Sequence, residues 1–245
     1  PLRVLVYNIH AGKDAKGADN LERVATIIRE SGADVALLQE VDRGTERSGK
    51  VDQVETLRRL TGYFGAFGKT LDYQGGDYGI AILSRWAIVS DTLTRLPVEP
   101  PQHRSGVSYE PRGALRVVIA APGRQLHVIN THIDPSREDF YRLQEARTLL
   151  TIASSLRDTG VTVVMGGDLN SEPSSAVIGL FAPAGWRDAF RECGKGTGLS
   201  YPANIPVKRI DYLMITGGTR CTMATVLNTE ASDHRPVLFV LREGR

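Results

Sequence analysis

Ser232-Asp233-His234-Arg235-Pro236-Val237 lies near the end of the chain and leads directly into the apolar run 237–241. This stretch places a carboxylate and an imidazole at the start of a segment that has the pattern of a buried strand. Four other polar clusters follow apolar runs of similar length. Strands that end in carboxylates, amides and imidazoles can build a site at one edge of a sheet, and packing alone does not require this recurrence. The four clusters are Asn8-Ile9-His10, Gln39-Glu40, Asn130-Thr131-His132 and Gly167-Asp168-Leu169-Asn170.

Length and composition are those of an ordinary globular protein. The 245 residues, 41% hydrophobic and 24% charged, fit a single domain over 1–245. No apolar run approaches the ~18 residues that span a bilayer. The N-terminus enters a strand-like run at once, so no leader is in view and a cytoplasmic monomer is expected.

Charge and cysteine content narrow the choice of function further. A net charge of +2 permits polyanion binding without demanding it. The stretch Arg43–Lys50 is one of the few places where positive charge gathers, and a solvated face is the alternative interpretation. Two cysteines, Cys193 and Cys221, exclude a disulfide framework and a cysteine zinc cluster. One disulfide could form between them, but two reduced thiols are expected.

The order of periodic segments predicts a mixed α/β architecture. Many short apolar runs alternate with few amphipathic segments, which favours sheets packed together with helices outside. Ser136 and Asp139 have the spacing of a capping box at the start of the longest helix. The proline-rich stretch 97–112 is expected to be a surface loop. Helices are predicted over 21–31, 52–60, 136–157 and 174–180, and strands near 4–6, 35–38, 63–67, 78–84, 86–93, 113–120, 125–131, 161–166, 210–215, 220–227 and 237–241.

Convergence of the acidic residues would require a compensating cation. Two carboxylates about 4 Å apart repel by roughly 4 kcal/mol at an effective dielectric of 20. If Glu40, Asp168, Asp211 and Asp233 share a pocket, either a cation binds or one acid keeps its proton. Oxygen and amide ligands with little sulfur suit Mg²⁺ or Mn²⁺ better than zinc. Such an ion polarises a phosphoryl oxygen and offsets charge on the leaving group.

These clusters, together with Arg209-Ile210-Asp211-Tyr212 and Ser232-Asp233-His234, resemble the endonuclease/exonuclease/phosphatase superfamily in order and approximate spacing. That group is similar to DNase I and includes neutral sphingomyelinases, inositol-polyphosphate 5-phosphatases, deadenylases and AP endonucleases. The resemblance spans residues 4–240. It implies a four-layer α/β sandwich with two central mixed β-sheets. It also implies Mg²⁺-dependent hydrolysis of a phosphate ester, with Mn²⁺ as a possible substitute.

The resemblance also suggests a role for each polar cluster. Glu40 would be the principal metal ligand with Asn8 beside it, and Asp233 would ligate metal or set its orientation. Two further residues of the family pattern would act on the water and the phosphate. Asp168 would orient or deprotonate the attacking water, and Asn170 would hold a phosphate oxygen.

The histidines and their partners leave alternatives open. His234 matches the histidine that contacts the scissile phosphate or acts as base, and Asp211 matches the acid that hydrogen-bonds it. Asp211 could instead pair with Arg209. His132 would be a second imidazole that protonates the leaving oxygen while His234 assists attack, or a buried histidine bound to a backbone carbonyl.

Three residues are weaker candidates for contact with substrate phosphate. His10 could line the metal pocket or act behind it. Arg112 could bind phosphate through its guanidinium or be a plain surface arginine. Ile80 stands where many relatives have asparagine, and Tyr78 or Asp77 could replace that contact.

A metal-dependent phosphodiesterase or phosphatase is therefore the leading interpretation, acting on a small-molecule, lipid-headgroup or nucleic-acid ester. Modest charge without a basic stripe lowers the expectation of a processive nuclease. A DNA or RNA endonuclease of the same fold remains the first alternative. A catalytically silent binding module is the second, although every core position of the site holds a competent residue.

Overall fold

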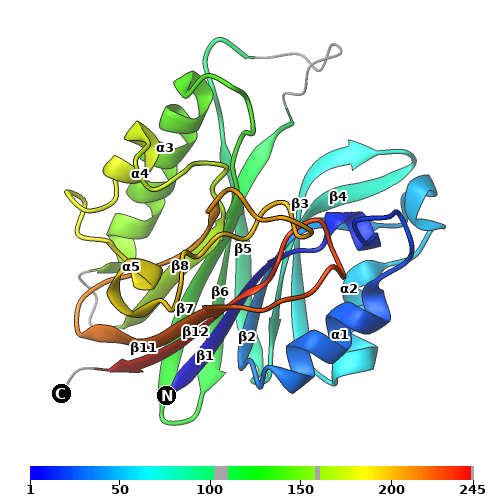
Figure 1. Ribbon diagram of the computed structural model, residues 1–245, viewed down its shortest axis with the longest axis horizontal. Coiled ribbons are helices and arrows are strands. Elements are labelled where there is room, and N and C mark those ends of the chain that lie inside the picture. Colours follow the sequence, from blue (N-terminus) through cyan, green and yellow to red (C-terminus); the bar gives the residue numbers. More distant parts are fainter. Residues whose placement is uncertain (102–109, 158–160, 244–245) are drawn as a thin grey trace.

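Two six-stranded mixed β-sheets pack face to face in the computed structural model, which describes residues 1–245 except 102–109, 158–160 and 244–245 (Figure 1). Each sheet contains one parallel strand pair among antiparallel neighbours. The predicted α/β sandwich is confirmed. The first sheet has the strand order β11 (Thr219–Val226), β12 (Val237–Glu243), β1 (Leu2–Asn8), β2 (Val35–Arg43), β4 (Gly76–Ser84), β3 (Phe64–Tyr73). The second has the order β5 (Ile88–Leu96), β6 (Arg112–Ala121), β7 (Arg124–His132), β8 (Thr162–Asp168), β10 (Asp211–Ile215), β9 (Arg187–Asp188).

Helices cover the outer face of each sheet and complete four layers. The predicted positions of the main helices are confirmed to within a few residues, while α5, β9 and the two 3-10 turns were not predicted. On the first sheet lie α1 (Leu21–Glu30) and α2 (Gln53–Thr61); on the second lie α3 (Phe140–Arg157) and α4 (Ala176–Gly179); α5 (Ala189–Cys193) packs beside β10 and β11, and 3-10 turns η1 (His10–Gly12) and η2 (Glu46–Ser48) follow β1 and β2.

Strand β1 shows why the sheets are apolar on both faces. Side chains of a strand alternate between faces, so an inner strand of a four-layer sandwich must be apolar at consecutive positions. Val4 and Val6 belong to the core between the sheets, whereas Leu5 and Tyr7 pack with the helices α1 and α2. The unbroken apolar run that predicts this strand thus reflects two separate cores.

The longest helix begins later than its capping-box spacing predicts. Helix α3 starts at Phe140, and the first helical carbonyl is that of Asp139, which accepts from Leu143 N at 2.8 Å. Ser136 is held in a turn instead, because its backbone N–H donates to Asp134 Oδ2 at 3.0 Å. The predicted surface loop over 97–112 lies partly outside the described residues, and its last residue, Arg112, opens β6.

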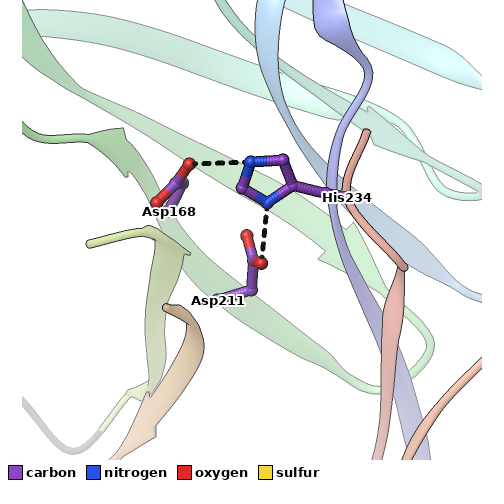
Figure 2. A group of neighbouring side chains, drawn as sticks. All are labelled: Asp168, Asp211 and His234. Carbon is purple, nitrogen blue, oxygen red and sulfur yellow. Dashed lines mark hydrogen bonds and ion pairs between the residues drawn. The ribbon is translucent and has the colours of Figure 1, made fainter. Parts of the chain in front are cut away.

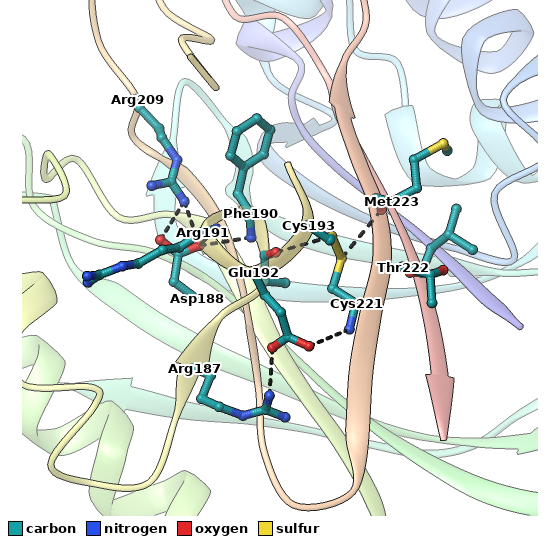
Figure 3. The surroundings of a disulfide bond; sticks show 12 residues. Arg187, Asp188, Phe190, Arg191, Glu192, Cys193, Arg209, Cys221, Thr222 and Met223 are labelled. Carbon is teal, nitrogen blue, oxygen red and sulfur yellow. Dashed lines mark hydrogen bonds and ion pairs between the residues drawn. A yellow bond between two sulfur atoms is a disulfide. The ribbon is translucent and has the colours of Figure 1, made fainter. Parts of the chain in front are cut away.

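Cys193 and Cys221 form a disulfide, so the expectation of two reduced thiols is wrong. Figure 3 shows the bond joining α5 to β11, with the two Cα atoms 5.6 Å apart. Sequence alone does not reveal that this short helix packs on that strand. Among the described helices, none combines the length and apolarity needed to cross a bilayer.

We expect the double variant Cys193→Ser/Cys221→Ser to unfold at lower urea concentration than the oxidised protein. The bond closes a loop with a sequence separation of 28 residues, and the loss should be about 3 kcal/mol. Equilibrium unfolding followed by circular dichroism measures it. Wild-type protein kept in reductant is the control and should match the variant. Equal midpoints for oxidised protein and variant would show that the bond adds no stability.

Candidate active site

The polar clusters meet where the parallel strand pairs of the two sheets end. In the first sheet Asn8 of β1 lies opposite Gln39 of β2. In the second sheet His132 of β7 lies opposite Asp168 of β8, and Asp211 of β10 faces Asp168 from the other side. Residues more than 200 positions apart in the chain therefore reach one edge of the sandwich.

Hydrogen bonds across the interface join the two sheets at this edge. The Asn8 amide nitrogen donates to Glu40 Oε1 at 2.9 Å and to Asp168 Oδ2 at 3.1 Å. Gln39 Nε2 donates to Asn130 Oδ1 at 2.7 Å, so a second amide pair bridges the sheets. All of these groups except Glu40 are buried. Buried amides and carboxylates need such partners because water is excluded.

A bulge in β2 sets the position of Glu40. The pairing of β2 with β4 shifts register between Leu38 and Val41, and Glu40 has a φ of 53°. A non-glycine residue in the left-handed region is strained by roughly 1–3 kcal/mol, and such strain is concentrated at functional sites. The bulge breaks the alternation of the strand, so that Gln39 reaches Asn130 while Glu40 reaches the cavity.

His234 lies between two carboxylates, as Figure 2 shows. Its Nδ1 is 2.9 Å from Asp211 Oδ2, and its Nε2 is 3.6 Å from Asp168 Oδ2. Ser200 Oγ donates to the same Asp211 oxygen at 2.5 Å. The ring of Tyr201 packs beside the imidazole, with ring centroids 4.7 Å apart. Asp211 therefore binds His234 and Ser200, which excludes the alternative pairing with Arg209.

Arg209, the alternative partner of Asp211, binds elsewhere. Its Nη2 lies 2.5 Å from the carboxylate oxygens of Asp188, at the start of α5 (Figure 3). The same Asp188 caps the helix by accepting from Phe190 N and Arg191 N. The loop that carries Ser200 and Tyr201 therefore begins at the end of α5 and is fixed near its last residue to the start of the same helix.

Burial and neighbouring charges have opposite effects on the pKa values of His234 and Asp168. Burial lowers the pKa of His234, but Asp211 and Asp168 outweigh it and raise the pKa to about 10. Burial also raises the pKa of Asp168 to about 7, against the opposing effect of His234. Burial, with help from Arg112 and the charge on His234, holds the pKa of His132 well below its usual range. The surroundings thus favour the neutral ring of His132 and the imidazolium form of His234.

A cavity of about 660 Å³ opens over these residues, a size typical of sites for small ligands. It is lined by most of the predicted site residues, and the remaining ones lie behind or beside it. Asn8 and Asp211 sit behind the wall and bind residues that form it. His10 lies outside, with Nε2 3.9 Å from Asp233 Oδ2. The predicted residues in the wall are Glu40, Tyr78, Arg112, His132, Asp168, Asn170, Asp233 and His234.

Two of the predicted phosphate contacts are far more buried than surface residues. Arg112 is only 4% exposed and lies 3.3 Å from Glu110 Oε2, so the alternative of a plain surface arginine is wrong. Tyr78 is also buried in the wall. The other predicted substitute, Asp77, is paired with Arg43 and Lys69. Asn170 is fixed through its amide nitrogen, which donates to the Ile133 carbonyl at 2.9 Å.

Three residues in the cavity wall, Tyr201, Lys208 and Arg142, were not predicted from the sequence. Tyr201 and Lys208 come from the irregular loop before β10. Arg142 comes from α3 and donates to the Asn170 carbonyl at 2.6 Å. Arg47 belongs to the basic stretch 43–50, for which the sequence allowed two interpretations, a polyanion-binding site or a solvated face. Its position in the cavity wall favours ligand binding.

The donor set suits a hard divalent cation. Oδ1 of Asp211 is buried without a hydrogen-bond partner among the described residues. Ligand atoms of Asp168, Asp211 and His234 all lie within 4.8 Å of one another. Glu40 and Asp168 also share one amide donor. The carboxylates of Glu40, Asp168 and Asp233 on the cavity wall offer the oxygen ligands that Mg²⁺ and Mn²⁺ prefer.

Fold and site together define a two-sheet α/β sandwich with an acid–histidine cluster at one edge of its sheets. The profile of the Endonuclease/Exonuclease/phosphatase family matches residues 5–234. The chain belongs to this family, whose members are phosphoester hydrolases.

Known proteins resemble the chain over nearly its whole length. An uncharacterized protein of Escherichia coli, YbhP, is 26% identical over 96% of this chain and 94% of its own length. A mannosyl-6-phosphatase of Bacteroides thetaiotaomicron superposes with a TM-score of 0.79 at 18% identity, covering 99% of this chain and 100% of its own. The human Nocturnin catalytic domain superposes with a TM-score of 0.76 at 19% identity, covering 99% and 93%. These structures share the fold.

Gly167, which precedes Asp168, should not tolerate a side chain. Its φ is 138°, and a Cβ would lie 1.9 Å from the Thr131 carbonyl oxygen of β7. We expect Gly167→Ala to lower the free energy of unfolding by about 3 kcal/mol or more, as measured by urea denaturation. Gly179→Ala is the control, because nothing lies within 4 Å of the added methyl group there. Equal stability of the two variants would contradict this account of Gly167 in β8.

Glu145, behind Arg112, gives a stability test that depends on pH. Its Oε2 accepts from Asp134 N at 2.7 Å, and burial raises its pKa to about 8. The unfolded value is about 4.3, so this group's stability is full below that pH and falls as pH rises towards 8. We expect Glu145→Gln to gain stability relative to wild type between pH 5 and 8.5 in urea unfolding. A constant difference would show that Glu145 is ionised throughout.

Proposed function

We propose that the protein is a Mg²⁺-dependent phosphoesterase that hydrolyses a phosphodiester by in-line attack of an activated water. The observation that carries this proposal is the convergence of Glu40, Asp168 and His234 on one cavity, with Asn8 and Asp211 fixing them from behind. Membership of a family of phosphoester hydrolases supports it. A silent binding module would not need so complete a set of acid, amide and imidazole groups.

Glu40 and Asp233 would hold the cation, because both carboxylates line the cavity. When bound, a divalent cation polarises a phosphoryl oxygen and offsets charge on the leaving group. Asn8, expected as a further ligand, donates its amide nitrogen to Glu40 and Asp168, while its oxygen accepts from His10 N at 3.0 Å. We therefore assign Asn8 to holding the two carboxylates at a fixed separation.

Asp168 and the two histidines would handle the protons. His234 lies between two carboxylates, which favours the imidazolium as a hydrogen-bond donor to a phosphate oxygen. Asp168 would orient the attacking water and accept its proton. His132 Nε2 lies 3.5 Å from Asp168 Oδ2, in a buried position that favours the neutral ring. This arrangement favours His234 as the contact to the scissile phosphate, one of the two roles expected for it from the sequence, over its role as base.

The cavity favours a small substrate over a long nucleic acid. Its volume of about 660 Å³ matches sites for small molecules. Two arginines of its wall are engaged by neighbouring carboxylates, Arg112 by Glu110 and Arg142 by Asp139, which leaves less positive charge for a long phosphate backbone. A nicking endonuclease that grips a few phosphates is the alternative, and its activity would fall steeply with salt.

We expect purified protein to hydrolyse bis-p-nitrophenyl phosphate with Mg²⁺ or Mn²⁺ and to stop in EDTA. Glu40→Gln and His234→Ala should each reduce kcat/KM by at least about 100-fold. His127→Ala is the matched control, because His127 lies on β7, the strand of His132, but outside the cavity wall. Near-normal rates in Glu40→Gln or His234→Ala would contradict the assignment. Absence of metal-dependent turnover in wild type would favour the binding module.

Parallel assays would identify the substrate class. Plasmid DNA, short RNA, sphingomyelin, inositol phosphates and mannose 6-phosphate should be compared at low and high salt. Mannose 6-phosphate is included because a structural neighbour is named for such an activity. Preference for a small ester with weak salt dependence supports the proposal, whereas salt-sensitive nicking of plasmid supports the endonuclease.

A further inference from the structure

A buried carboxylate next to the cavity holds Arg47 in one orientation. Asp42, fully buried, accepts from Arg47 Nε at 2.7 Å and from Arg47 Nη2 at 2.8 Å. Thr45 Oγ1 and Ser48 Oγ donate to the same carboxylate at 2.7 and 2.5 Å. Burying a carboxylate is costly unless its oxygens are satisfied. Here four donors, two of them from a guanidinium, satisfy it.

The loop that carries Arg47 is itself fixed to the frame of the site. Gln53, the first residue of α2, accepts from Asp42 N at 2.8 Å and donates to the Ala11 carbonyl at 2.9 Å. Ala11 belongs to η1, directly after the strand that ends in Asn8. Arg47 is therefore tied to the same strand ends that position Glu40.

Aromatic rings complete the support of the guanidinium. Its carbon lies 4.6 Å from the ring centroid of Tyr73 and 5.4 Å from that of Tyr78. Arg47 and Tyr78 both line the cavity, and the Arg47 side chain keeps 35% exposure. Asp42 uses the Nε–Nη2 edge, and no hydrogen bond engages Nη1 among the residues that the structure describes, so its donors can serve a ligand.

Arg43 shows what a purely structural arginine looks like in this region. It binds Asp77 Oδ2 through Nε and Nη2 at 3.0 and 2.7 Å and stacks on Phe67 at 4.4 Å. The chemistry matches that of Arg47, but Arg43 does not line the cavity. Location in the wall, rather than the ion pair, is what distinguishes Arg47.

We propose that Arg47 binds a second anionic group of the substrate, beyond the phosphate that is hydrolysed. This inference rests on the proposed function, which places the scissile phosphate at Glu40, Asp168 and His234. Tyr78 lines the same cavity as Glu40 and Arg47, and its ring centroid lies 5.4 Å from the guanidinium carbon of Arg47. A guanidinium with one edge fixed and one edge free suits a phosphate or carboxylate oxygen. The natural substrate is accordingly a small ester with two anionic groups.

Glucose 1,6-bisphosphate and glucose 6-phosphate form a matched pair of probes. Their affinities are measured by isothermal titration calorimetry and as competitors of bis-p-nitrophenyl phosphate hydrolysis. We expect wild type to bind the bisphosphate about tenfold or more tightly than the monophosphate, and Arg47→Ala to lose that preference. Arg43→Ala is the control and should keep it. Equal weakening of both probes by Arg47→Ala, or no preference in wild type, would overturn the proposal.

Loss of Arg47 leaves Asp42 unpaired, so thermal melting of each variant is recorded. If Arg47→Ala does not fold, Arg47→Gln decides, because glutamine keeps a hydrogen-bond donor for Asp42 but offers no charge to a second anion. A selective loss of bisphosphate affinity in Arg47→Gln supports the proposal, and an unchanged preference overturns it. Calorimetry needs no turnover. Failure of hydrolysis in wild type would therefore count against the proposed function separately from the Arg47 result.

Discussion

The amide of Asn8 is the contact on which the geometry of the site depends. It links Glu40 of one sheet to Asp168 of the other, at a depth where water is excluded. A buried donor without partners would cost roughly 1–3 kcal/mol, so the two sheets can pack in few relative positions that satisfy it. Gln39 and Asn130 repeat the arrangement one residue deeper. The same contacts satisfy the buried amides and hold the acidic side chains together at one edge of the sandwich.

The pattern of apolar runs predicted most of the strands of the fold. Continuous apolar runs that end in polar clusters predicted strands whose ends meet, and pairing of Asn8 with Gln39 and of His132 with Asp168 explains why. The four-layer arrangement was expected from the resemblance to the family, because periodicity does not predict how sheets and helices stack. Of the predicted site residues, Asn8 and Asp211 bind residues of the cavity wall from behind, and His10 lies outside the wall with its Nε2 3.9 Å from Asp233 Oδ2. The roles of all these residues stay predictions.

The residues that were missed depend on contacts between distant segments. The pairing of Cys193 with Cys221 requires that a short helix pack on β11, and no local pattern predicts that packing. Tyr201 reaches His234 from an irregular loop. Arg47 did carry a local signal, since it lies in a basic stretch. That signal could not be separated from solvated charge, because burial of Asp42 is visible only in the folded chain.

The order in which the chain supplies its site residues has a consequence for biosynthesis. Asn8 is made first and His234 last, and Asp211 has no imidazole to bind until that segment exists. Ser232 Oγ then closes the arrangement by donating to the Asn8 carbonyl at 2.7 Å. A ribosome-bound fragment that stops short of these residues holds acids and amides with no completed centre. The proposed catalytic centre is therefore complete only once the whole sandwich has closed, and a chain that ends before Ser232 would lack it.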